Sequence, residues 1–144
     1  MVSVISLTKA KNRLAVLWFS GGGIILFVVI LQSLLGHYGT RAADAFGWLL
    51  PTIMPTLSLV IGVLVADALG ANPRRKDRIN MFLYHLAFAI STAYLLAVAL
   101  TIAVAPFAQA SPLELMEMSN LFLGPLQGLT ASALGAFFFK PDPL

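Results

Sequence analysis

Four long apolar segments constrain this chain more than any other feature of its sequence. They cover residues 14–35, 46–69, 79–105 and 118–139 and contain almost no charge. At about 1.5 Å per residue, a helix of this length crosses a hydrocarbon core of roughly 30 Å. None of the segments alternates with the two-residue period of a strand. We therefore predict an all-α integral membrane protein, a four-transmembrane-helix bundle that forms one membrane domain over residues 1–144.

The composition supports this class. Hydrophobic residues make up 59% of the chain and charged residues only 10%, against about 25% charged residues in soluble domains. A soluble protein with so little charge would expose a large apolar surface. The alternative for the first segment is a signal peptide, because lysines and an arginine precede it. Its apolar core exceeds the roughly 7–15 residues typical of signal peptides, so we expect a retained helix.

The basic residues predict the orientation. Eight of nine fall in three regions that four spans place on one side of the membrane, namely Lys9, Lys11 and Arg13, then Arg74, Arg75, Lys76 and Arg78, then Lys140. The opposite side holds Arg41, Asp44, Glu114 and Glu117. Because positive loops stay in the cytoplasm, we predict cytoplasmic termini and a plasma membrane location, specifically the bacterial inner membrane.

The basic turn between the second and third segments is a candidate contact for lipid or for a cytoplasmic protein. Its cationic residues are Arg74, Arg75, Lys76 and Arg78. Short basic clusters beside apolar segments suit anionic lipid headgroups. A nucleic-acid partner is not expected, since it would require a broad basic face.

The fourth segment carries small residues at helical spacing, Gly124, Gly128, Ser132 and Gly135. Such a stripe lets two membrane helices approach closely. It indicates either packing within the bundle or a contact between subunits of a homo-oligomer. Upstream, Ser111, Pro112 and Glu114 predict a helix start with a capping box.

Prolines and glycines interrupt the other segments. Pro51 and Pro55 break the second segment, and Gln127 in the fourth is a candidate lining residue for a polar path. Gly21, Gly22 and Gly23 predict a tight helix crossing or a flexible kink in the first. Tyr38 and Trp48 are expected in an aromatic belt at the membrane interface.

Asp67 and His85 are the ionisable residues of the spans. Asp67 lies near the negative end of its helix dipole, so we expect a basic partner from Arg13 or from the turn. Intramembrane ionisable residues are often functional, which makes Asp67 and His85 a candidate ion or proton site. The alternative is a structural role for each, as an ion pair and as a hydrogen-bonded histidine.

Two functional hypotheses follow. Catalytic motifs, cysteines and paired intramembrane carboxylates are missing from the sequence, so we expect no enzyme, catalytic site, metal site or cofactor. The first hypothesis is a homo-oligomeric channel or membrane-permeabilising subunit with the pathway between subunits. The second is a non-conducting membrane anchor or assembly subunit that binds a cytoplasmic partner or anionic lipid through residues 72–78.

Overall fold

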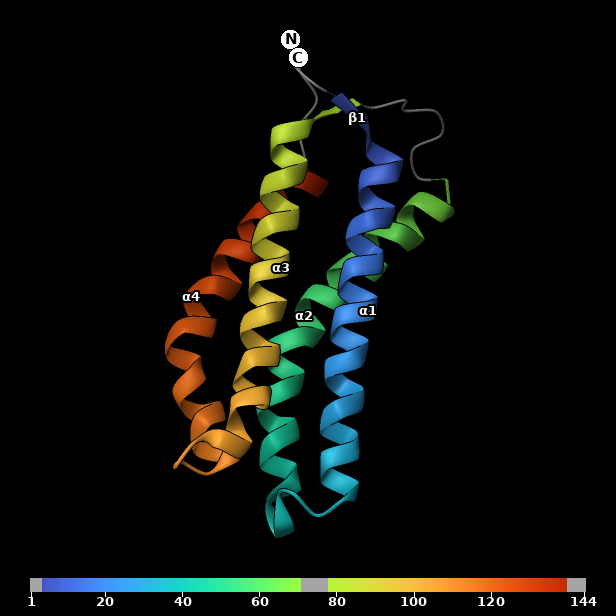
Figure 1. The fold of residues 1–144 in the computed structure, drawn as a ribbon. Helices are drawn as coiled ribbons and strands as arrows, with labels where there is room; N and C mark the ends of the chain where they lie inside the picture. Colours follow the sequence, from blue (N-terminus) through green and yellow to red (C-terminus); the bar gives the residue numbers. More distant parts are fainter. Residues whose placement is uncertain (1–3, 71–77, 140–144) are drawn as a thin grey trace.

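The described part of the chain folds into four long helices that run alternately up and down (Figure 1). The computed structural model describes residues 4–70 and 78–139. The elements are β1 (Val4–Ser6), α1 (Leu7–Leu34), η1 (Gly39–Arg41), α2 (Ala42–Ala68), β2 (Arg78–Asn80), α3 (Met81–Val104), η2 (Ala105–Phe107) and α4 (Pro112–Phe138). All four helices are long and apolar enough to cross a membrane, which confirms the predicted helix bundle.

The helices pack so that α1 contacts α2 and α3, while α4 contacts the same two helices. The starts of α1 and α3 and the ends of α2 and α4 lie together (Figure 1). We call this the basic end, because Lys9, Lys11 and Arg13 are there. The opposite end, with Arg41, Asp44 and the start of α4, is called the acidic end.

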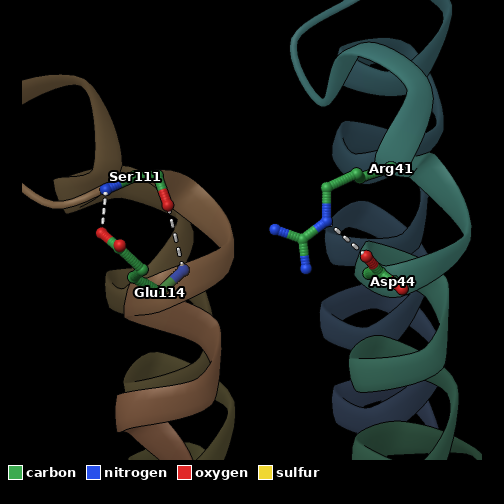
Figure 2. Close-up of polar contacts among 4 residues, drawn as sticks. All are labelled: Arg41, Asp44, Ser111 and Glu114. Carbon is green, nitrogen blue, oxygen red and sulfur yellow. Dashed lines mark hydrogen bonds and ion pairs between the residues drawn. The ribbon is translucent and has the colours of Figure 1, made fainter.

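Helices α1 and α4 begin before the predicted apolar segments because capping residues set their starts. α1 begins at Leu7, where the Ser6 side chain accepts a hydrogen bond from the Lys9 backbone amide at 3.4 Å. α4 begins at Pro112 with the predicted capping box (Figure 2). There Ser111 Oγ accepts from the Glu114 amide at 3.3 Å, and the Glu114 carboxylate accepts from the Ser111 amide at 2.8 Å.

A small antiparallel sheet at the basic end was not predicted. β1 pairs with β2, with Ile5 opposite Ile79, so residues 79 and 80 form a strand and do not begin the third helix as expected. Asn80 then caps α3, its Oδ1 accepting from the Phe82 amide at 2.9 Å. This pairing joins the start of the first helical hairpin to the start of the second.

The turn between α1 and α2 is built on glycines with left-handed backbone angles, φ of 76° at Gly36 and 57° at Gly39. Tyr38 between them is buried, and its hydroxyl donates to Gln32 Oε1 at 2.6 Å. Burial raises the pKa of Tyr38, which keeps the phenol protonated as a donor. Tyr38 is therefore a packing residue of this turn, and its place in an aromatic interface belt stays a prediction.

The glycine run of α1 supports close packing, because the helix continues through it. A Cβ added at Gly21 would lie 2.9 Å from Leu95 Cδ1 on α3, and one at Gly22 would lie 3.5 Å from Leu57 Cδ1 on α2. At Gly23 an added Cβ meets nothing within 4 Å. Among these three glycines, Gly21 is thus the one packed most closely against α3, with the tip of the Leu95 side chain over it.

We predict that Gly21→Leu destabilises the fold by about 1–3 kcal/mol, because the new side chain overpacks the contact with Leu95. The matched control is Gly23→Leu, which makes the same change two residues away on an exposed face. Thermal or denaturant unfolding of the purified protein in detergent, followed by circular dichroism, measures both. Equal stability of the two variants would contradict the assignment of Gly21 to the crossing.

Candidate functional site

The second helix contains two prolines and therefore lacks two backbone donors. α2 continues through Pro51 and Pro55, so the carbonyls one turn earlier, at Gly47 and Pro51, lose their usual amide partners. The Gln127 side chain of α4 donates from Nε2 to the Pro51 carbonyl at 3.2 Å. A side chain on a neighbouring helix thereby replaces the donor that Pro55 cannot supply.

Further hydrogen bonds join α2 to its neighbours at the same level. Trp48 Nε1 donates to Ser119 Oγ on α4 at 3.1 Å, and Tyr94 on α3 donates its hydroxyl proton to the Thr52 carbonyl at 2.8 Å. Trp48 is only 9% exposed, so it is a buried link between α2 and α4, and its place in an aromatic interface belt stays a prediction. The half of α2 that contains the prolines is therefore held by polar contacts from both α3 and α4.

Beside these contacts, a polar groove of about 500 Å³ lies between α2 and α4 at the acidic end. Its lining includes Asp44, Glu117, Asn120 and Gln127 together with Gly47, whose carbonyl lacks the amide of Pro51. Arg41 lines its mouth, where Arg41 Nε lies 2.7 Å from Asp44 Oδ2 (Figure 2). Oxygen atoms and amides of this kind suit water or small cations better than apolar ligands.

The groove adjoins an exposed stripe of small and polar residues on each helix. On α2 the stripe comprises Gly47, Pro51, Pro55, Ser58, Gly62 and Ala66, and on α4 it comprises Glu117, Asn120, Gly124, Gly128, Ala131 and Gly135, with Ser132 beside it. Spacings of three and four residues keep each stripe on one side of its helix. We call the two stripes together the small-residue face.

The predicted glycines of α4 lie on this face and are not covered by the rest of the bundle. Gly124, Gly128 and Ser132 are exposed, and Gly135 is partly exposed. A Cβ added at Gly124, Gly128 or Gly135 meets nothing within 4 Å in the described part of the chain. Within residues 4–70 and 78–139, these glycines therefore make no close helix crossing.

Asp67 has a partner on α1, and His85 has one within its own helix. Asp67 Oδ2 lies 2.8 Å from Lys11 Nζ, with the two side chains 46% and 12% exposed. The expected partner Arg13 lies on another side of α1, because two residues turn a helix by roughly 200°. His85 Nδ1 is 2.8 Å from the Met81 carbonyl of its own helix. Among the hydrogen bonds of the described residues, none joins Asp67 to His85.

The remaining predicted site is the basic turn. Arg74, Arg75 and Lys76 lie outside the described residues, and of Arg78 the structure describes the backbone pairing with Ser6. Metal-ligating side chains do not gather in groups of three or more within the described ranges.

Sequence reasoning proposed Gln127 for a polar path but missed its contact with Pro51, and it missed Lys11 as the partner of Asp67. The four-residue spacing of Pro51 and Pro55 was the available signal, because it marks a freed carbonyl that needs an outside donor. For Lys11, no local signal separates it from Arg13.

The chain matches no protein family, and neither a curated protein nor a solved structure is significantly similar to it. Its function is therefore inferred from its own geometry.

We predict that Gln127→Leu destabilises the protein by about 1 kcal/mol, the scale of a side-chain hydrogen bond between membrane helices. In a Pro55→Ala background the same change should cost clearly less, because the restored Ala amide can donate to the Pro51 carbonyl. A double-mutant cycle of unfolding free energies in detergent measures this coupling. Additive effects of the two substitutions would show that Gln127 does not replace the missing donor.

Proposed function

We propose that the chain spans the bacterial inner membrane four times with its basic end in the cytoplasm. Lys9, Lys11 and Arg13 support this orientation, since they stand at the start of α1. At the acidic end, Arg41 is the single lysine or arginine among the described residues. The positive-inside rule then favours the basic end as the cytoplasmic one.

Cysteine labelling tests this orientation, because the chain has no native cysteine. A membrane-impermeant maleimide should label Gln109→Cys in intact cells, whereas Thr8→Cys should react only after permeabilisation. Both native residues are exposed, at opposite ends of the bundle. Labelling of Thr8→Cys from outside would reverse the proposed topology.

We infer next that subunits associate through the small-residue face. Elsewhere the bundle exposes large apolar side chains, such as Phe27 at 65% on α1 and Phe82 at 69% on α3, which suit contact with lipid tails. Exposed glycine and serine gain little from lipid, but they allow another helix to approach closely. The small-residue face therefore favours contact with protein, most simply a second copy of the same chain.

Such an association places the polar groove at the subunit interface. The groove residues Glu117, Asn120 and Gln127 lie on α4 near its glycine stripe, so copies meeting there would enclose these polar groups together. Toward the basic end, Ser58 and Ser132 continue the face. We accordingly propose a homo-oligomeric channel or permeabilising protein whose pathway for water or small cations runs between subunits. The observation that carries this proposal is the exposed small-residue face along both α2 and α4.

Gly128→Leu tests the assembly. A Cβ at Gly128 meets nothing within 4 Å in the described part of the subunit, so the variant should fold with native helix content while its oligomer dissociates. The control Gly23→Leu makes the same substitution at an exposed glycine of α1 and should leave the oligomer intact. Light scattering coupled to size exclusion measures the mass, and ion flux into liposomes measures the pathway.

The native oligomer and Gly23→Leu should conduct, and Gly128→Leu should lose flux with its subunit contact. An unchanged oligomer in Gly128→Leu would contradict the interface. A native oligomer of defined size without flux would exclude the pathway and favour the alternative function, a non-conducting anchor or assembly subunit.

A further inference from the structure

We propose that the groove between α1 and α3 at the basic end binds one anionic phospholipid. The groove has a volume of about 690 Å³ and lies between helices whose other exposed residues are mostly large and apolar. It is separate from the small-residue face of α2 and α4. Its polar lining is Asn12, Arg13 and His85, and its apolar lining includes Val16, Leu17 and Phe88.

The polar part of the groove suits a phosphate headgroup. Arg13 and His85 are exposed and reach it from neighbouring helices. Lys9 precedes Arg13 by four residues and so lies on the same side of α1, one turn farther toward the basic end. Since the Met81 carbonyl can only accept, His85 Nδ1 donates to it. In the doubly protonated, cationic ring Nε2 can then donate to the headgroup phosphate. The described carboxylate at this end, that of Asp67, is paired with Lys11 on another side of α1.

The apolar part continues the groove toward the middle of the bundle. Through Leu17 and Ser20 it joins a second hollow of about 250 Å³, whose walls include Ile24, Leu96 and Ala99. From Arg13 to Ile24 the helix rises about 16 Å, close to half of a hydrocarbon core of roughly 30 Å. The length therefore matches that of one acyl chain.

The hydroxyls in the deeper part are already satisfied. Ser20 Oγ donates to the Val16 carbonyl at 2.6 Å, and Thr92 Oγ1 donates to the Phe88 carbonyl at 2.8 Å. A path for water or ions would need free polar groups there. The apolar walls instead suit a hydrocarbon chain. The polar part of the groove and its apolar part therefore follow one another in the same order as the headgroup and the acyl chain of a phospholipid. Basic pockets between membrane helices bind anionic headgroups in this way.

The purified full chain, titrated with phosphatidylglycerol and with phosphatidylcholine of the same acyl chains, tests the headgroup site by native mass spectrometry. We expect tighter binding of phosphatidylglycerol and a loss of about five-fold in its affinity in Arg13→Gln. Lys11→Gln is the matched control, since it removes the same charge two residues away on another side of α1. It should reduce the affinity by much less.

Ser20→Phe tests the acyl-chain site, because the new ring fills the junction of the two hollows. It should weaken the binding of long-chain phosphatidylglycerol while leaving that of the dihexanoyl lipid nearly unchanged. Circular dichroism and melting in detergent verify that each variant is folded. Three outcomes would each overturn the proposal. They are equal affinity for the two headgroups, equal effects of Arg13→Gln and Lys11→Gln, and unaltered binding of the long-chain lipid in Ser20→Phe.

Discussion

The arrangement depends on one constraint, that backbone polar groups within a hydrocarbon layer must find partners inside the protein. Helices α1 and α3 meet it largely through their own ladders, but Pro51 and Pro55 remove two donors from α2 and Pro125 removes one from α4. Gln127 supplies a donor from α4. This contact links the position and rotation of α4 to the prolines of α2. It therefore helps to define which residues of these two apolar helices lie opposite one another.

The same constraint separates the two sides of the bundle chemically. Freed carbonyls and the groups around them make the α2 and α4 side polar near the acidic end, and small residues extend that side toward the basic end. The α1 and α3 side keeps its backbone satisfied and exposes large apolar side chains. The small-residue face is thereby suited to protein contact around a polar groove, while the large apolar side chains that all four helices expose, such as Leu121 at 82% on α4, are suited to lipid.

The number of helices and their approximate limits could be predicted, because apolar length and capping residues act locally. Ser111 and Glu114 show this, since their capping box needs only four consecutive residues. The contacts between helices could not be predicted in the same way. Segments such as 79–105 are apolar on every side, so no periodicity marks the buried face. The pairing of Ile5 with Ile79 joins residues far apart in the chain, and strands of three residues carry almost no pattern.

The basic residues of α1 bear on two separate properties, the orientation of the chain in the membrane and the contacts between helices. Orientation by the positive-inside rule depends on how many cations flank a span, so Lys11 and Arg13 contribute equally to it. Contacts depend instead on the angle at which each side chain leaves the helix. Lys11 turns toward α2 and pairs with Asp67, while Arg13 lines the groove shared with α3. Lys11 and Arg13 count equally for topology but face different helices. Neutralising either one therefore lowers the net charge of this end by the same amount while removing a different contact.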